Sequence, residues 1–196
     1  MYRSQNLREI KNALRKTFSS RRAAIPDEEH RLYSNSICDA FMSTEEYKKA
    51  DAVLLYVSIN REVRTKNLID KILADKKRVA LPVCFENGIM EFRYIKSKKD
   101  LTRGLFSAPE PNKNCELFTG AQNAVCVIPA LSFDVEGYRL GYGKGYYDRY
   151  LSGFNVFRVG FCFDALFEEN LPRGKFDKKV DMVITEKGVW YTDEKK

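Results

Sequence analysis

Apolar residues recur along the chain with two periods, and the changes between them predict alternating helices and strands. Residues 3–22 carry apolar side chains at steps of three and four, typical of an amphipathic helix: Leu7, Ile10, Leu14 and Phe18. Pro26, followed by acidic residues, indicates the start of a second helix, and 65–75 has the spacing of another. Apolar runs predict strands at 52–58, 78–84, 125–128, 156–163 and 180–185.

The predicted strands differ in pattern, and the difference indicates the kind of sheet. The run AVLLYVS at 52–58 is apolar at almost every position, as in a strand buried on both faces of a parallel sheet. In contrast, 89–95 alternates, and the Asn87-Gly88 pair before it predicts a hairpin with 78–84. Because strands alternate with helices and no hinge or repeat is visible, residues 1–196 are predicted to form one three-layer α/β domain. Its central sheet would be mostly parallel and flanked by helices.

Two segments lack a clear period. Residues 102–120 contain Pro109, Pro111 and two glycines, and a loop of this length in a small domain is usually functional or mobile. Phe106 within it could line a ligand pocket or pack against neighbours, and the pattern leaves both open. The tail at 191–196 is expected to fray.

The composition is that of an ordinary globular protein. Of 196 residues, 44% are hydrophobic and 31% charged, and no apolar run approaches the roughly 18 residues that span a bilayer. The N-terminus has no signal-peptide pattern, and the five cysteines are scattered without a C-x-x-C pair. A cytoplasmic protein with reduced thiols is therefore expected.

Histidine content and net charge narrow the chemistry. The single histidine, His30, lies in a polar helical segment and is predicted to be a solvated surface residue, so neither a zinc site nor a histidine general base is expected. The net charge of +7 indicates an anionic partner, either nucleic acid or an anionic small molecule. Short scattered groups of lysines are typical of a solvated surface and do not decide between the two.

Residues 125–151 combine an apolar strand, a glycine-rich loop and an aromatic helical segment. The alternating glycines from Gly141 to Gly145 allow the backbone to approach a ligand closely, and Arg139 and Lys144 add cations. Asp148, in the first helical turn, could stabilise the helix dipole or bind magnesium. The spacing matches neither the P-loop nor the dinucleotide-binding fingerprint. It therefore leaves two interpretations, a phosphate site or a tight turn capped by the aspartate.

Other polar residues are ambiguous by position. Lys11 and Arg15 are one turn apart and lie on a different side of the first helix from its apolar face. Glu62 follows the strand at 52–58, and the carboxyl ends of strands are where open α/β sheets bind ligands. From position alone, the plainer interpretation of all three is a solvated charge.

The string PALSFDVEGYRLGYGKGYYDRYL at 129–151 resembles the signature of the 5-formyltetrahydrofolate cyclo-ligase family, also called methenyltetrahydrofolate synthetases. The match includes Pro129, Phe133, Asp134, Gly137, Arg139, Leu140, Gly141, Gly143, Gly145, Tyr146, Tyr147 and Asp148. KNALR at 11–15 and VDMVIT at 180–185 match further family segments. The resemblance implies a NagB/RpiA/CoA-transferase-like fold. It also implies conversion of 5-formyltetrahydrofolate and ATP into 5,10-methenyltetrahydrofolate, ADP and phosphate, with Mg²⁺ and a phosphorylated formyl (imidate) intermediate.

The resemblance also implies roles for individual residues. ATP would contact Lys11, Arg15, Arg139, Leu140, Gly141, Tyr142, Gly143, Lys144, Gly145, Tyr146 and Tyr147. The folate would contact Arg15, Val57, Glu62, Tyr142, Gly143, Lys144, Gly145 and Tyr146, although position 142 varies in the family. Arg139, Lys144 and Asp148 would be catalytic, and Asp148 and Asp181 would bind magnesium.

Two other functions remain alternatives at this point. A nucleic-acid-binding protein would use the positive charge, but interleaved basic and aromatic patches of a known module are not visible. An isomerase or acyl-CoA-transferase-like enzyme on a similar scaffold would need no ATP or magnesium. The expected partners are ATP and 5-formyltetrahydrofolate, with or without a polyglutamate tail, and neither a specific nucleic acid nor a membrane. The chain is expected to be a monomer or weak dimer.

Overall fold

The structure, a computed structural model, describes residues 4–106 and 108–192. Its helices are α1 (Ser4–Ala24), α2 (Asp27–Ser43), α3 (Glu45–Lys49), α4 (Lys66–Ala74) and α5 (Tyr146–Tyr150). Its strands are β1 (Ala52–Leu54), β2 (Arg78–Cys84), β3 (Met90–Ile95), β4 (Leu101–Arg103), β5 (Pro109–Pro111), β6 (Ala124–Ile128), β7 (Ser132–Asp134), β8 (Arg139–Leu140), β9 (Phe157–Phe161), β10 (Phe167–Glu168), β11 (Met182–Thr185) and β12 (Gly188–Tyr191). None of the helices in these ranges combines the length and apolar character needed to cross a bilayer.

A seven-stranded central sheet organises the fold, in the order β12-β11-β9-β6-β1-β2-β3. The inner pairs are parallel, and only the edge strands β12 and β3 pair in the antiparallel sense. Every residue of β1 and β6 is buried, because the sheet is covered on both faces. The predicted α/β fold with a mostly parallel sheet is therefore confirmed.

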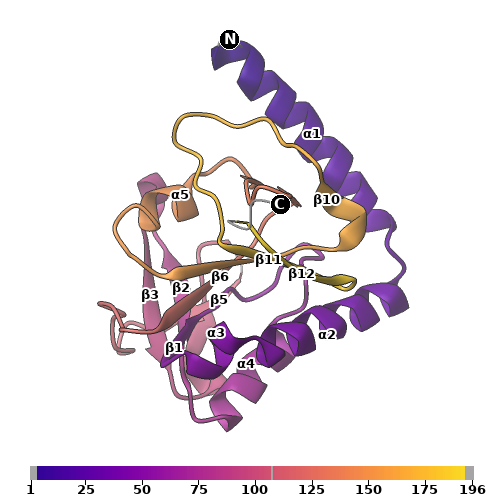
Figure 1. The fold of residues 1–196 in the computed structure, drawn as a ribbon. Coiled ribbons are helices and arrows are strands. Elements are labelled where there is room, and N and C mark those ends of the chain that lie inside the picture. Colours follow the sequence, from indigo (N-terminus) through magenta and orange to yellow (C-terminus); the bar gives the residue numbers. More distant parts are fainter. Residues whose placement is uncertain (1–3, 107, 193–196) are drawn as a thin grey trace.

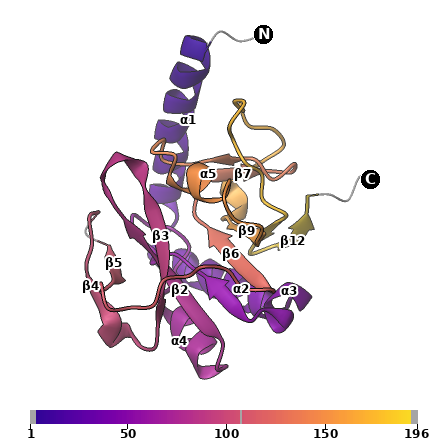
Figure 2. The same cartoon turned by 90° about the vertical axis from the view of Figure 1, so that its left-hand side faces the viewer.

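The two faces of the central sheet are covered differently. Helices α2, α3 and α4 lie together on one face, below the sheet in Figure 1. On the other face lie α5 and a small sheet of order β10-β7-β8, as the turned view in Figure 2 also shows. Tyr150 of α5 packs on Phe92 of β3, with ring centroids 5.0 Å apart. The long helix α1 also lies on this side, so the second outer layer includes a small sheet, whereas the prediction named only flanking helices.

The apolar run at 52–58 forms a shorter strand than its pattern predicts. β1 ends at Leu54, and the amide of Leu55 still donates to the carbonyl of Ala80 at 2.9 Å. Beyond it the chain leaves the ladder while Tyr56 and Val57 stay buried. The run is apolar because it is enclosed, and its last residues supply a wall of the cleft described below.

Two segments without periodicity contain regular structure. Within 102–120, β5 pairs with β4 in a short antiparallel hairpin, which corrects the prediction of a structureless loop. At the C-terminus, β12 pairs with β11, so Tyr191 belongs to a strand, and the amide of Thr192 donates to the carbonyl of Asp181. Residues 193–196 of the predicted frayed tail, and residue 3 of the first predicted helix, lie outside the described residues.

His30 is a buried residue, and its predicted place at the surface is wrong. Its Nε2 lies 2.9 Å from the carbonyl of Arg61, and its Nδ1 accepts a hydrogen bond from Arg64 at 3.0 Å. The ring also packs on Phe163, with centroids 5.0 Å apart. Burial lowers the pKa of His30, so the neutral ring serves as a structural link between α2 and the loop that holds Glu62.

At Gly160 of β9 the central sheet lies close against the small sheet. A Cβ built at Gly160 would lie 2.5 Å from the ring of Phe133 in β7, and that ring is fully buried. We therefore expect Gly160→Ala to lower the free energy of unfolding by about 1–3 kcal/mol, as overpacking usually does. Urea unfolding followed by circular dichroism measures the change, and a loss below about 0.5 kcal/mol would show that the sheets can separate freely.

Candidate functional site

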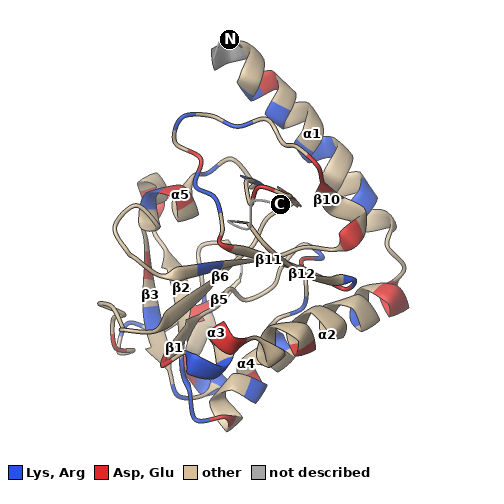
Figure 3. Cartoon of the chain, viewed as in Figure 1, with Lys and Arg blue, Asp and Glu red and all other residues tan. Residues whose placement is uncertain are grey.

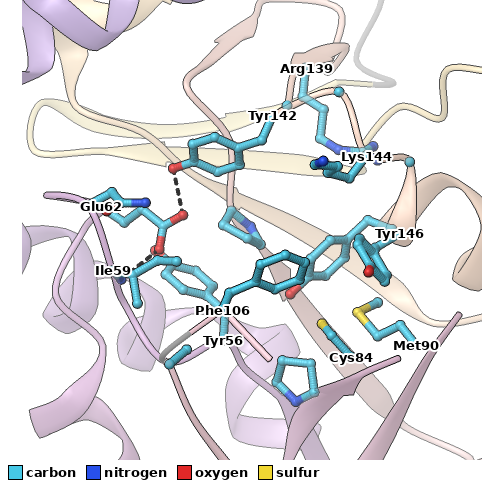
Figure 4. Close-up of a pocket in the computed structure, with 18 of the residues that line it drawn as sticks. Tyr56, Ile59, Glu62, Cys84, Met90, Phe106, Arg139, Tyr142, Lys144 and Tyr146 are labelled. Atoms are coloured by element: carbon cyan, nitrogen blue, oxygen red, sulfur yellow. Dashed lines mark hydrogen bonds between the residues drawn. The ribbon is translucent and has the colours of Figure 1, made fainter. Parts of the chain in front are cut away.

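A cleft of about 600 Å³ opens at the carboxyl ends of β1 and β6. Its walls come from α1, the loop after β1, the end of β2, the start of β3, Phe106, the segment 108–110 and the segment 139–148. The close-up in Figure 4 shows these side chains converging from both sides of the opening. Segments far apart in the chain meet here because parallel strands bring their carboxyl ends to one edge of the sheet.

One end of the cleft is cationic. Lys11 and Arg15 reach it from α1, Arg139 from β8 and Lys144 from the glycine loop. Nε of Arg15 donates to the carbonyl of Gly141 at 2.8 Å, which holds α1 against the loop. Burial lowers the pKa of Arg15, since the charged guanidinium is partly removed from water. An anionic ligand placed among these groups would replace the lost hydration.

The glycine loop has the backbone conformations that its sequence requires. Gly143 and Gly145 have φ of 84° and 70°, a region that residues with a Cβ rarely adopt. A Cβ built at Gly141 meets nothing within 4 Å, so this position opens into the cleft. The helix that follows, α5, has only five residues and a correspondingly small dipole. Phosphate binding would therefore rest on the loop amides and the cations around them.

Arg139 and Asp148 form an ion pair at the base of the cationic end. Nη2 of the arginine donates to Oδ1 of the aspartate at 2.7 Å, and Nη1 donates to the carbonyl of Lys178 at 2.7 Å. The backbone amide of Lys178 also donates to Oδ1, at 3.2 Å. Arg139 is only 9% exposed, so its charge is held in one orientation by β8 and the 178 backbone.

Glu62 stands at the opposite end, held by a tight turn. Its Oε2 accepts from the amide of Ile59 at 2.9 Å, and its Oε1 accepts from the hydroxyl of Tyr142 at 2.7 Å, as the dashed lines in Figure 4 show. Asn60 and Arg61 both have positive φ, 47° and 59°, and strain of this kind concentrates at binding sites. With 6% exposure, Glu62 has a pKa raised by burial.

Between these two ends the cleft is apolar and aromatic. Its surface there comes mainly from Pro82, Cys84, Met90, Phe106 and Tyr146. The rings of Phe106 and Tyr146 meet edge to face at 5.8 Å. The hydroxyl of Tyr146 donates to the carbonyl of Phe85 at 2.8 Å, which fixes the ring as a wall. A flat aromatic ligand fits such a surface. Of the two alternatives left open for Phe106, lining a pocket or packing against neighbours, the structure shows the first.

All the predicted site residues except Asp181 line this one cleft. Asp181 lines a separate depression at the amino ends of β6 and β9, and its Oδ2 accepts from the amide of Arg158 at 2.7 Å. The predicted magnesium pair of Asp148 and Asp181 is therefore not assembled. The reason is the direction of β11: Asp181 precedes a strand whose carboxyl end points toward the cleft side of the sheet.

Two carboxylates of the cleft were not predicted from the sequence. Asp177 forms an ion pair with Lys11 and accepts from the amide of Gly174 at 2.7 Å. Glu110 is buried, and burial raises its pKa. Glu110 lies in the segment 102–120 and Asp177 between two predicted strands, so the sequence offered no signal beyond the acidic side chain itself.

Comparisons with known proteins agree with this geometry. Residues 7–186 match the model of the 5-formyltetrahydrofolate cyclo-ligase family. The chain is 30% identical to a probable 5-formyltetrahydrofolate cyclo-ligase of Schizosaccharomyces pombe, over 89% of this chain and 94% of the other. It is 28% identical to the 5-formyltetrahydrofolate cyclo-ligase of Escherichia coli K12, over 87% and 97%. The NMR structure of 5,10-methenyltetrahydrofolate synthetase from Aquifex aeolicus superimposes with a TM-score of 0.86 at 33% identity, covering 95% of each chain. The chain is therefore an enzyme that belongs to the 5-formyltetrahydrofolate cyclo-ligase family.

Proposed function

We propose that this enzyme uses ATP and Mg²⁺ to close 5-formyltetrahydrofolate into 5,10-methenyltetrahydrofolate, with release of ADP and phosphate. One observation carries the proposal: a single cleft joins a cationic, glycine-lined end to an apolar middle and a buried carboxylate. The first end suits a triphosphate, the middle suits the aromatic part of a folate, and Glu62 suits the N–H donors of its pterin. The ligands would thus meet between Glu62 and Lys144.

The reaction requires two bond exchanges. The formyl oxygen attacks the γ-phosphorus of ATP and ADP leaves, which gives an imidate phosphate. The neighbouring folate nitrogen then attacks the formyl carbon, loses its proton, and phosphate departs with the oxygen. Both steps depend on placing reactants and stabilising phosphate charge, and need little proton transfer by the protein. This requirement suits a cleft rich in lysine and arginine. The one histidine of the enzyme, His30, is buried outside the cleft.

The charged side chains divide the work by position. Arg139, oriented by Asp148, and Lys144 would stabilise negative charge on the transferred phosphoryl group. Lys11 and Arg15 would close over the triphosphate from α1. The hydroxyl of Tyr142 holds the carboxylate of Glu62 in the orientation in which it would accept from the pterin.

Of the two predicted magnesium ligands, Asp148 lies in the cleft and fits the metal. Among the described residues, both hydrogen bonds to this carboxylate fall on Oδ1, which leaves Oδ2 to coordinate a metal or to accept a hydrogen bond from its water. Magnesium in nucleotide sites often takes only one or two carboxylates beside phosphate oxygens and water, so one aspartate is sufficient. When bound, the ion would neutralise phosphate charge. Asp181, which lies outside the cleft, is not part of this proposal.

An absorbance assay for methenyltetrahydrofolate tests the proposal, with ATP and magnesium each omitted in turn. Product formation is expected only when both are present. Turnover without either one would favour an isomerase or acyl-transferase activity on this scaffold instead. RNA binding that weakens steeply with salt, without ATP turnover, would favour the nucleic-acid alternative. The five cysteines are free, as in proteins of a reducing compartment, and we propose that the enzyme is a cytoplasmic monomer or weak dimer.

Gly141→Ala should impair nucleotide binding without harming the fold. The added methyl group would meet no protein atom, yet it would occupy space in the glycine-lined end of the cleft. We expect the Kd for ATP to rise about tenfold or more, since close approach of backbone amides to phosphate is lost. Isothermal titration calorimetry measures this Kd. Gly153→Ala is the matched control, because its Cβ makes an ordinary contact at 3.7 Å outside the cleft. If both variants bind ATP with equal affinity, the glycine loop does not form part of the phosphate site.

A further inference from the structure

Arg22, in the last turn of α1, is a buried charge that the proposed function does not use. Figure 3 shows basic residues along α1, and Arg22 stands apart because only 4% of its surface is exposed. Within residues 4–106 and 108–192 its guanidinium pairs with no carboxylate, and Nη1 donates to the carbonyl of Ala130 over a long 3.4 Å. Burying a charge without a partner is costly, so this arginine calls for a negative group nearby.

A chain of contacts leads from Arg22 to Glu62. The guanidinium carbon lies 5.7 Å from the ring centroid of Tyr142, which is the distance of a cation–π contact. The hydroxyl of the same ring donates to Oε1 of Glu62 at 2.7 Å, drawn as a dashed line in Figure 4. Because Arg22 and Glu62 are both buried, little water screens their attraction. Each charge thus lowers the cost of burying the other.

We propose that Arg22 is a positioning residue that, acting through Tyr142, keeps the buried carboxylate of Glu62 charged at neutral pH. The inference rests on the proposed function, in which this carboxylate accepts from the N–H donors of the pterin. A protonated carboxyl group carries a hydrogen on one oxygen and is a weaker acceptor than a carboxylate. Arg22 therefore sets the lower limit of the pH range in which the enzyme uses folate.

The electrostatics around Glu62 give the direction of the effect. Burial raises the pKa of Glu62, and the charge of Arg22 opposes that rise. The hydroxyls of Tyr56, Tyr142 and Tyr147 also act on this carboxyl group, and their own pKa values are raised, chiefly by removal from water. These hydroxyls stay neutral over the working range. Without Arg22 the pKa of Glu62 rises further, so folate use is lost at a higher pH.

The pH dependence of kcat/KM for folate, at saturating ATP, tests the assignment because it reports ionisation of the free enzyme. Arg22→Met removes the charge and keeps a long apolar side chain. The acidic limb of its profile should lie about one pH unit above that of the parent, whereas kcat/KM at alkaline pH should stay within about threefold. Arg22→Lys should keep the limb of the parent.

Arg21→Met is the matched control for the pH profile. Arg21 lies in the same last turn of α1, so it shares the position near the helix C-terminus. Its side chain is 53% exposed and pairs with Glu168 at 2.8 Å, away from Glu62. The acidic limb of this variant should coincide with that of the parent.

A double-mutant cycle with Glu62→Gln measures the same coupling without catalysis. In urea unfolding near neutral pH, Arg22→Met should lower the free energy of unfolding more in the parent than in the Glu62→Gln variant. In acid, where Glu62 is protonated, the two losses should be equal. If Arg22→Met does not fold, Arg22→Gln takes its place in both measurements, since its amide can still donate to Ala130.

The outcomes separate the two proposals. If the parent makes methenyltetrahydrofolate and Arg22→Met lowers kcat/KM by the same factor at every pH, the arginine is merely structural and the proposed function stands. Equal losses of unfolding free energy in the two backgrounds near neutral pH would also overturn the inference. A parent enzyme that makes no product with ATP and magnesium would overturn the proposed function, and the unfolding cycle would still decide whether Arg22 and Glu62 are coupled.

Discussion

Arg139→Ala is expected to lower turnover about a hundredfold or more. The guanidinium is almost fully buried and is fixed by Asp148 and by the carbonyl of Lys178, each at 2.7 Å. A charge held in this way stabilises the transition state without reorganisation, and loss of such a group typically costs a few kcal/mol of activation free energy. The absorbance assay at saturating ATP and folate measures the change in kcat.

Two further variants separate catalysis from folding. Arg139→Lys keeps the positive charge but loses the forked geometry, so its kcat should lie between those of the parent and Arg139→Ala. Arg31→Ala removes an exposed arginine of α2 that pairs with Glu28, and its kcat should stay within about twofold of the parent. If Arg139→Ala is folded by circular dichroism and turns over within threefold of the parent, the role assigned to this arginine is wrong.

Glu62→Gln should weaken the use of folate by about 10–100-fold in kcat/KM. The carboxylate is expected to accept from the N–H groups of the pterin, and hydrogen bonds to a charged group contribute about 1.5–3 kcal/mol. Glutamine keeps the shape and the contacts with Ile59 and Tyr142, because a tyrosine hydroxyl can also accept. Steady-state kinetics with varied folate measures the loss, and an unchanged kcat/KM would place the pterin elsewhere.

The same substitution should make the protein more stable at neutral pH. Burial raises the pKa of Glu62 above its ordinary value of 4.5, so folding favours the protonated form. The parent keeps the full stability of that neutral form below pH 4.5 and loses part of it as the pH rises through the raised pKa. Unfolding free energies of the parent and Glu62→Gln should thus converge in acid and diverge toward neutral pH, with the variant more stable. Parallel curves would show that Glu62 does not titrate as its burial predicts.

Much of the cleft could be identified from the sequence because its parts are local. The loop from Gly141 to Gly145 needs positive φ at two glycines. Arg139 and Lys144 are near or within this loop in the sequence, so they lie at the same place in the fold. Lys11 and Arg15 share one side of a helix by spacing alone. The resemblance to a known family then assigned these residues to one ligand, and the structure brings them to one cleft.

The errors arose where a residue's environment depends on distant segments. His30 has a polar neighbourhood in sequence, yet the loop that carries Arg61 and Arg64 folds over it and encloses the ring. Asp181 has the family's local pattern, yet it lies at the amino end of its strand, outside the cleft. Burial and side-chain partners of this kind are set by strand order and loop packing, which local periodicity does not encode.

The sequence by itself determined the apolar strands, the amphipathic first helix and the glycine loop with its cations, since each depends on spacing within a few residues. Only the tertiary structure decided which carboxylates enter the cleft, Asp177 and Glu110 among them, and that Phe176 stands open beside the cationic end. The physical reason is that parallel strands collect their carboxyl ends at one edge of a sheet. Loops far apart in the chain become neighbours there, and their side chains together form one binding site.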